Sequence, residues 1–207
     1  MPTPVTEIVI LSFLPNSQLE DPIHSAHTIL QRQDGFLRFK WGRWEEDQDK
    51  VQLFINWKDI THHQAFIASG AEYTALLATV SAILTQPPEI IHVHFALGHE
   101  TINKILDDPV VELATFYAVG EGFEEAVDRT LAVGAKSEGC LGYVRGGVVE
   151  ELEFGDKKEK GKGHFAAISW TSVQARLEAT KREDVREAGG VIIGRIGGYE
   201  VHHVRFR

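Results

Sequence analysis

The spacing of apolar residues in the first half of the chain predicts an alternation of strands and helices. Four short segments rich in branched and aromatic residues, bounded by turn residues, are typical of β-strands. Two longer segments between them repeat apolar residues at helical spacing. The predicted strands are 7–13, 36–44, 51–57 and 90–95, and the predicted helical segments are 18–32 and 60–84, the latter broken near Gly70.

The second half repeats this order of strand, helix, strand, strand, helix, strand. A charged, glycine-rich tract at 155–163 separates its two middle strands and predicts a mobile loop, with 156–162 the most mobile part of the chain. The predicted strands are 112–118, 141–149, 164–170 and 201–206, and the predicted helices are 121–136 and 173–195, the latter weakened at Gly189-Gly190.

Short matches between the two halves indicate an internal duplication, because they occur in the same order along the chain. They predict a first half at 1–98, a linker at 99–108 with room for a short helix, and a second half at 109–207. The matches are Pro4–Ile8 with Pro109–Leu113, Asp34–Leu37 with Glu138–Leu141, Ile55–Trp57 with Ile168–Trp170, and Glu89–Phe95 with Glu200–Phe206.

The predicted order of elements is that of the ferredoxin-like split βαβ unit, an α+β fold with an antiparallel sheet. Helices cover one face of such a sheet, and the other face needs a partner. The second half supplies that partner, so we predict two tandem ferredoxin-like βαββαβ halves forming one intramolecular, pseudo-dimeric α+β barrel. No homodimer is then needed to close the barrel, and the sequence leaves open whether two chains also form a homodimer.

The amino-acid composition argues against some classes of function. The net charge of −9 argues against nucleic acid and anionic membranes as partners, since both need a basic surface. Cys140 is the single cysteine, so no intrachain disulfide forms. No signal sequence is recognised in the first residues, and no apolar run reaches the roughly 20 residues that span a bilayer. We therefore expect a cytoplasmic protein.

The sequence resembles the dimeric α+β barrel superfamily, in particular the antibiotic biosynthesis monooxygenase family in its tandem fungal form. The resemblance covers nearly the whole chain. The segments that carry it are Thr6-Glu7-Ile8, Asn56-Trp57, His63-Gln64-Ala65-Phe66 and Ile91-His92-Val93-His94-Phe95.

The resemblance implies several activities. The family includes oxygenases of aromatic polyketides that use no cofactor, haem-degrading enzymes, and relatives that isomerise or cyclise small molecules. The main hypothesis is therefore oxygenation of an aromatic or polyketide-like compound without a bound cofactor. A cyclase or isomerase with the same pocket is one alternative, and a non-catalytic ligand-binding or stress-responsive barrel is the other.

His63 is the first candidate catalytic residue. It shares one helical stripe with Ile60 and Ile67, and that stripe should face the sheet. An inward histidine can orient a substrate or move a proton, because its usual pKa is near 6.5. The alternative is a structural histidine that bonds a backbone carbonyl.

Three further residues complete the predicted site. Asn56 is the second catalytic candidate, as a hydrogen-bond donor to a carbonyl or enolate, although it neighbours Trp57 on the opposite face of the strand. Trp57 and Tyr73 are the predicted substrate-binding walls, and each is also explained by packing alone.

His92 and His94 share one face of the last strand and are a possible metal pair. No third ligand is evident from the spacing, so we predict no metal and no cofactor. In the second half, Arg176 and Ser169 stand where the first half has His63 and Asn56. An arginine does not readily act as a base, which predicts that the first half carries the chemistry.

Overall fold

The computed structural model describes residues 3–155 and 159–207. The chain divides into two compact units. One runs to His94 and includes Arg207, and the other comprises Phe95–Phe206. Both are α+β, and in each the elements follow the predicted order of strand, helix, strand, strand, helical segment, strand.

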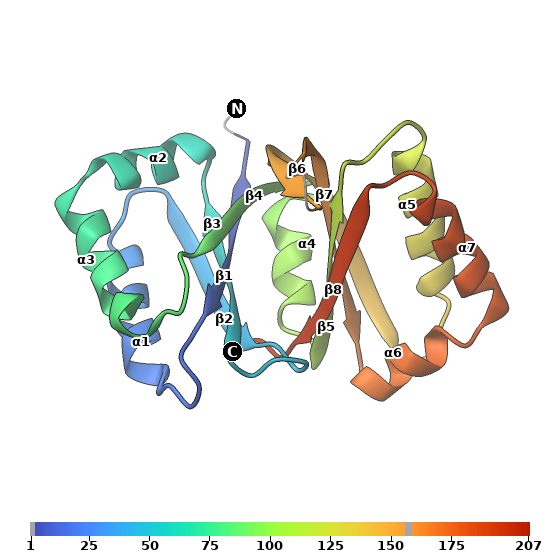
Figure 1. The fold of residues 1–207 in the computed structure, drawn as a ribbon, viewed down its shortest axis with the longest axis horizontal. Coiled ribbons are helices and arrows are strands. Elements are labelled where there is room, and N and C mark those ends of the chain that lie inside the picture. The colour runs from blue at the N-terminus through green and yellow to red at the C-terminus, as the bar shows by residue number, and fades with distance from the viewer. Residues whose placement is uncertain (1–2, 156–158) are drawn as a thin grey trace. The chain divides into compact units, whose positions relative to one another are not determined.

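The first unit places its helices on one side of a four-stranded sheet (Figure 1). The strand order is β2-β3-β1-β4, and every neighbouring pair is antiparallel. The helical segment after β3 breaks at Gly70, as the sequence predicted, because its φ of 67° lies in the left-handed region. The elements are β1 (Val5–Ser12), α1 (Glu20–Leu30), β2 (Phe36–Arg43), β3 (Lys50–Trp57), α2 (Ile60–Ala68), α3 (Ala71–Val80), the 3₁₀ turn η1 (Ser81–Ile83) and β4 (Glu89–Phe95).

The core of the first unit lies between this sheet and its helices. Alternate residues of β1 and β3 point to the helices, and α1 meets them with Ile23, Ala26 and Leu30 on one stripe. The opposite stripe of α1 is exposed, which explains its amphipathic sequence. The strand residues of this core include Val5, Val9, Leu11, Val51, Leu53, Ile55 and Trp57.

The second unit repeats the arrangement with the strand order β6-β7-β5-β8, again antiparallel throughout. Helices α5 and α7 cover one face of its strands, and α4 lies on the other side, with Ile105 close to Gly142 (Figure 1). The elements are α4 (Gly98–Ile105), β5 (Val110–Tyr117), α5 (Phe123–Gly134), β6 (Cys140–Phe154), β7 (Glu159–Trp170), α6 (Val173–Ala179), α7 (Glu183–Ile193) and β8 (Gly198–Val204).

One prediction for the second unit, the length of its hairpin, is wrong. The β6–β7 hairpin is longer than predicted, because Glu153 pairs with Lys160 and Phe154 with Glu159 in what the sequence suggested was loop. Phe154 stacks on Tyr117 at 5.0 Å, and this packing extends the strand. Residues 156–158 of the tract that we predicted to be mobile lie outside the described residues.

The last helical segment breaks between α6 and α7, and Gly189 and Gly190 both lie within α7. Glycine costs a helix about 1 kcal/mol, which packing against α5 offsets here. Most of the predicted linker 99–108 is helical, as α4.

Among the described residues, no single helix is long and apolar enough to cross a membrane. Ile60–Ala68 and Ala71–Ile83 meet the length and apolarity criteria only together, and they bend by 90° where they meet.

His164 makes the second unit sensitive to acid. Its side chain is buried beside Arg145, which binds Asp128 through two hydrogen bonds of 2.6 and 2.7 Å and also binds Glu124. Burial, together with the charge of Arg145, lowers the pKa of His164 to about 4 from 6.5. The folded state therefore takes up this proton at lower pH than the unfolded state.

We expect the free energy of unfolding to fall by up to about 3 kcal/mol as the pH drops from 6.5 to 4, because the unfolded state binds the proton first. Urea titrations of the wild type and His164→Gln at several pH values measure this, and the variant should show a flatter pH dependence. The exposed His24→Gln variant is the control. Equal slopes for wild type and His164→Gln would contradict the assignment.

Candidate active site

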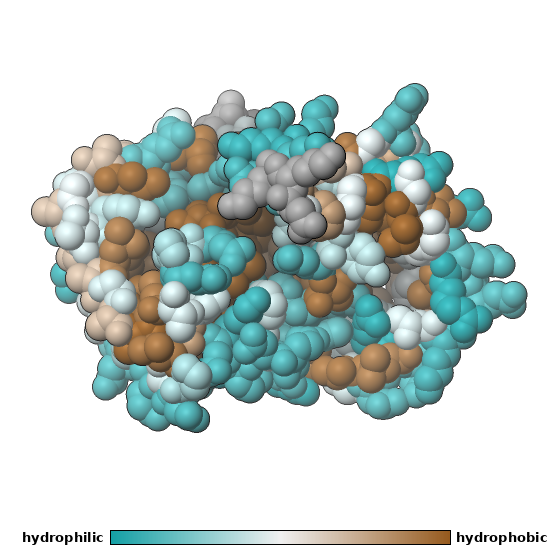
Figure 2. Space-filling model, in the orientation of Figure 1, coloured by the Kyte–Doolittle hydropathy of each residue, from teal (hydrophilic) through white to brown (hydrophobic). Residues whose placement is uncertain are grey.

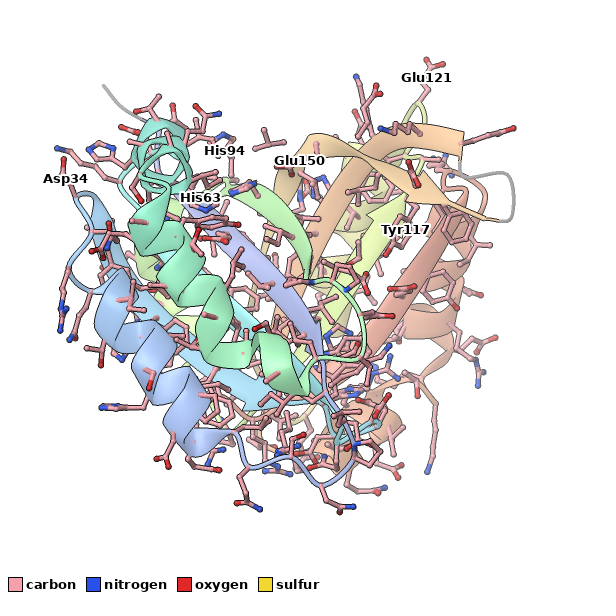
Figure 3. The ribbon with its side chains drawn as sticks, turned by 60° about the vertical axis from the view of Figure 1, so that its left-hand side comes forward. Asp34, His63, His94, Tyr117, Glu121 and Glu150 are labelled. Atoms are coloured by element: carbon pink, nitrogen blue, oxygen red, sulfur yellow. The ribbon has the colours of Figure 1, made fainter. Side chains whose placement is uncertain are left out.

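A buried cluster of polar side chains lies between the sheet and α2 of the first unit. Glu7 of β1 pairs directly with His92 of β4, which puts both side chains on the face toward the helices. His63 reaches this face from the first turn of α2, as the stripe with Ile60 predicted, and Figure 3 shows it on the side of α2 toward the strands.

The start of α2 is fixed by a strong cap, which sets the position of His63. The carboxylate of Asp59 accepts hydrogen bonds from the backbone N–H groups of Thr61 and His62 at 2.9 and 3.2 Å. The side-chain hydrogen bonds from Thr61 and His62 hold the pKa of Asp59 well below its usual range. The helix therefore begins at a defined residue, one turn before His63.

Two hydrogen bonds and one longer polar contact connect the cluster in a row. The indole N–H of Trp57 donates to Glu7 Oε2 at 2.8 Å, and His63 Nε2 lies 3.4 Å from the same oxygen. His63 Nδ1 and His92 Nε2 are 2.7 Å apart and share a hydrogen bond. The ring of His63 also stacks on Trp57, with centroids 5.1 Å apart. Glu7, His63 and His92 thus form a path along which a proton can move.

The cluster is almost dry. The side chains of His63 and Glu7 are 2% and 6% exposed. A carboxylate at this depth is costly unless it is hydrogen-bonded or paired with a cation. The Trp57 N–H and the His63 imidazole meet that requirement on one carboxylate oxygen.

Glu7 links this cluster to a narrow cavity of about 60 Å³ between the sheet, α1 and α3. Apolar side chains form most of its wall, and the ionisable residues on it are Glu7 and Tyr73. Burial and the charge of Glu7 raise the pKa of the Tyr73 phenol. Tyr73 also meets Phe66 edge to face at 5.5 Å. His63, His92 and Trp57 stand behind Glu7 and do not line the cavity.

The predicted site residues are therefore only partly brought together. His63 and Trp57 meet at Glu7, and Tyr73 shares the cavity with that carboxylate. Asn56 lies on the other face of the sheet, where its Oδ1 accepts a hydrogen bond from Thr6 at 2.9 Å. Strand alternation separates Asn56 from the other three residues.

His92 and His94, the possible metal pair noted in the sequence, have different partners. His94 Nδ1 lies 2.9 Å from the backbone oxygen of Pro4, and His92 bonds to His63 instead. Glu7, His63 and His92 do place one ligand atom each within 4.8 Å of one another. One carboxylate and two imidazoles suit first-row transition metals, so these three residues could hold such an ion.

The distance between the two histidine nitrogens favours the hydrogen bond over metal ligation in this conformation. Two nitrogens bound to one tetrahedral zinc are about 3.3 Å apart, given Zn–N bonds of about 2.0 Å. The observed 2.7 Å is shorter, and it is an ordinary hydrogen-bond length. Metal binding would therefore require the two rings to separate.

The second unit carries an equivalent cluster in which an arginine takes the place of the histidine. Trp170 Nε1 donates to Glu112 Oε2 at 3.1 Å, and Arg176 Nη2 donates to Glu112 Oε1 at 2.9 Å. Glu112 pairs across strands with His203, as Glu7 pairs with His92. Arg176 thus occupies the place of His63, in line with the alignment of the two halves.

Sequence reasoning missed the role of Glu7. The signal was present: an acidic residue within an otherwise apolar strand, repeated as Glu112 at the matching position of the second half. A buried carboxylate in both halves needs a partner in both, and the partners come from the helix after the following tryptophan.

Comparison with known proteins places the fold. An anthrone oxidase-like protein superposes with a TM-score of 0.74 at 15% identity, over 99% of this chain and 93% of that one. A candidate monooxygenase from Lactobacillus acidophilus NCFM gives 0.61 at 16% identity, over 99% and 94%. A candidate chlorite dismutase gives 0.64 at 12% identity, over 100% and 96%.

No family model matches the sequence. No curated protein matches it either. The structural matches span the whole chain, and at these identities they establish the fold. The chain therefore shares the α+β fold of these structures.

Proposed function

We propose that this protein is an oxygenase of a small aromatic or polyketide-like compound and that it uses no bound cofactor. The observation that carries the proposal is the Glu7 carboxylate on a cavity wall, backed by the buried His63 and His92. A carboxylate linked to imidazoles in a dry site can remove and store a proton. The names of the structural neighbours, monooxygenase and anthrone oxidase-like, support the same class of reaction.

The proposed reaction begins at a methylene flanked by aromatic rings or a conjugated carbonyl. Glu7 takes a proton from this carbon, and His63 stabilises the protonated pair and passes the proton toward His92. The electron-rich carbanion reacts with dioxygen to a peroxide anion, which takes back the stored proton and becomes a hydroperoxide. The remaining hydrogen on that carbon then leaves as a proton while the O–O bond breaks, which releases water. The CH₂ group and O₂ thus become a carbonyl and H₂O, with both electron pairs supplied by the substrate.

Two residues, Trp57 and Tyr73, have supporting roles in this proposal. The Trp57 N–H fixes the orientation of the Glu7 carboxylate, and the stacked indole holds the His63 ring in place. The phenol of Tyr73 lines the same cavity as Glu7 and would donate a hydrogen bond to a substrate oxygen. We assign the proton transfer to Glu7 and His63 and not to Asn56, because Asn56 is on the other face of the sheet.

Substrate entry requires α3 to move, since a cavity of about 60 Å³ is far below the roughly 300 Å³ of small ligand pockets. Helix α3 is suited to this, because Val80 is its one fully buried residue and it begins at the left-handed Gly70. Figure 2 shows hydrophobic surface over this side of the first unit, where Ile67 and Leu77 are exposed. Opening exposes the apolar wall of the cavity, which a bound apolar substrate would cover again.

Oxygen uptake tests the proposal directly. An anthrone is the first substrate to try, followed by other polycyclic compounds with an acidic CH₂, each with and without EDTA. We expect uptake of one O₂ per product, with one oxygen atom gained by the product and no loss with EDTA. Loss with EDTA that Fe²⁺ restores would assign a metal to Glu7, His63 and His92 and overturn the cofactor-free mechanism.

The same assay separates the alternatives. A cyclase or isomerase would change the product without uptake of oxygen and without a change in mass. A ligand-binding protein would show binding and no product.

The duplicated sequence supports a further part of the proposal, the architecture. We infer that 1–98 and 109–207 are ferredoxin-like halves joined by 99–108 and that they close one barrel within the chain, each serving as the other's partner.

A further inference from the structure

The second unit contains open space beneath its helices. Two adjoining cavities of about 240 and 300 Å³ lie between its sheet and helices α5, α6 and α7. They share part of their walls, including Glu112, Leu131 and Ile168, so a ligand can extend through both. Taken together, the two cavities fall in the range of small-molecule pockets, about 300–1,000 Å³.

Small side chains create this space. In the first unit Val9 and Leu53 pair across the floor of the sheet, and in the second unit the equivalent pair is Ala114 and Ala166. On the helix side, Gly189 of α7 lines both cavities, and a Cβ added there would meet no atom within 4 Å. The space therefore results from residue choice on both walls.

The cavity walls carry an excess of positive charge. Glu112 is neutralised by its ion pair with Arg176, at 2.9 Å. Arg186 also lines the outer cavity, from an exposed position on α7. The inner cavity is mostly apolar, with Phe116, Val127 and other aliphatic side chains. An apolar body and one negative group would match these walls.

We propose that the second unit binds a hydrophobic carboxylic acid, with its apolar body against Ala114 and Ala166 and its carboxylate toward Arg186 and Arg176. This site binds without reaction, because the partner of its buried carboxylate is an arginine, which keeps its proton at ordinary pH. The proposal does not rest on the oxygenase function, since it concerns a different cavity.

Calorimetric titration of the full chain with 2-naphthoic acid and dodecanoic acid tests the proposal. We expect at least one of them to bind and its uncharged amide to bind about tenfold more weakly or less, a difference of about 1.4 kcal/mol. Gly189→Leu should abolish binding by filling the cavity. Gly190→Leu, one residue further along α7, is the matched control and should bind as the wild type, because Gly190 is exposed and lines neither cavity.

Ala166→Leu and Arg186→Glu keep the test valid if Gly189→Leu fails to fold. Ala166→Leu restores the leucine of the first unit and should also abolish binding. Arg186→Glu should weaken it about tenfold, a loss of about 1.4 kcal/mol, and Arg129→Glu, an exposed residue on α5, should not. The proposal is overturned if neither acid binds, if the amide binds as well as the acid, or if Gly189→Leu and Gly190→Leu behave alike.

Discussion

Replacing His63 with alanine is expected to lower oxygen uptake by about 100-fold or more, because general acid–base groups contribute about 10² to 10⁴ to rates. The variant removes the imidazole that lies 3.4 Å from Glu7 and breaks the link to His92. The Trp57 hydrogen bond to Glu7 stays, so the carboxylate keeps its place. The loss should fall on kcat, with little change in KM, because His63 does not line the cavity.

The readouts separate a role in proton transfer from a role in packing. His63→Gln keeps a hydrogen-bonding group and loses the titratable ring, so it should be nearly as slow as His63→Ala and should lose the wild-type pH dependence of kcat. Thermal unfolding of each variant checks that the fold is retained.

His62→Gln is the matched control, since His62 is the adjacent residue on α2. Its backbone hydrogen bond to the Asp59 cap stays in the variant, and the glutamine amide can replace the imidazole as a donor to Asp59. The variant should retain near wild-type uptake. Full activity in His63→Ala, or an equal loss in His62→Gln, would refute the role of His63.

Replacing Arg176 with methionine is expected to lower the free energy of unfolding by about 3 kcal/mol, the usual cost of leaving one buried charge without its partner. Glu112 is 8% exposed and accepts the Arg176 hydrogen bond at 2.9 Å. Adding Glu112→Gln to this variant should recover most of the loss, because the unpaired charge is then absent. Urea denaturation of the wild type, both single variants and the double variant measures the coupling.

An exposed ion pair serves as the control for this cycle. Lys181 binds Glu178 at 2.6 Å, but both side chains are more than half exposed. Lys181→Met should therefore cost no more than about 1 kcal/mol. If Arg176→Met costs no more than Lys181→Met, or if the double variant is as unstable as Arg176→Met, Glu112 does not depend on the arginine.

The two clusters differ in the residue that partners their buried carboxylate. In the first unit Glu7 faces His63, whose proton can leave, and in the second unit Glu112 faces Arg176, whose proton stays. The same buried carboxylate is therefore suited to proton transfer in one half and to a fixed ion pair in the other. This difference supports placing chemistry in the first unit and binding in the second.

The sequence by itself determined the order of strands and helices in both units. Local signals were sufficient: periodic apolar residues, and glycines such as Gly70 where the chain must turn. The same periodicity predicted that His63 faces the sheet, because an amphipathic helix buries one stripe of its residues. It also showed that Asn56 and Trp57 point to opposite faces of β3.

Only the tertiary structure decided what His63 meets there. Glu7 and His92 are far apart in sequence, and they become neighbours because the register of β1 and β4 pairs them. The same structure decided which face of β3 carries the helices, and so separated Asn56 from Trp57. The volume of the cavities also could not be predicted from local sequence patterns. It depends on small residues such as Ala166 of the sheet and Gly189 of the helix layer, which lie on opposite walls. Contacts between distant segments depend on the packing of the whole unit. The spacing of residues along the chain therefore does not predict any one of these contacts.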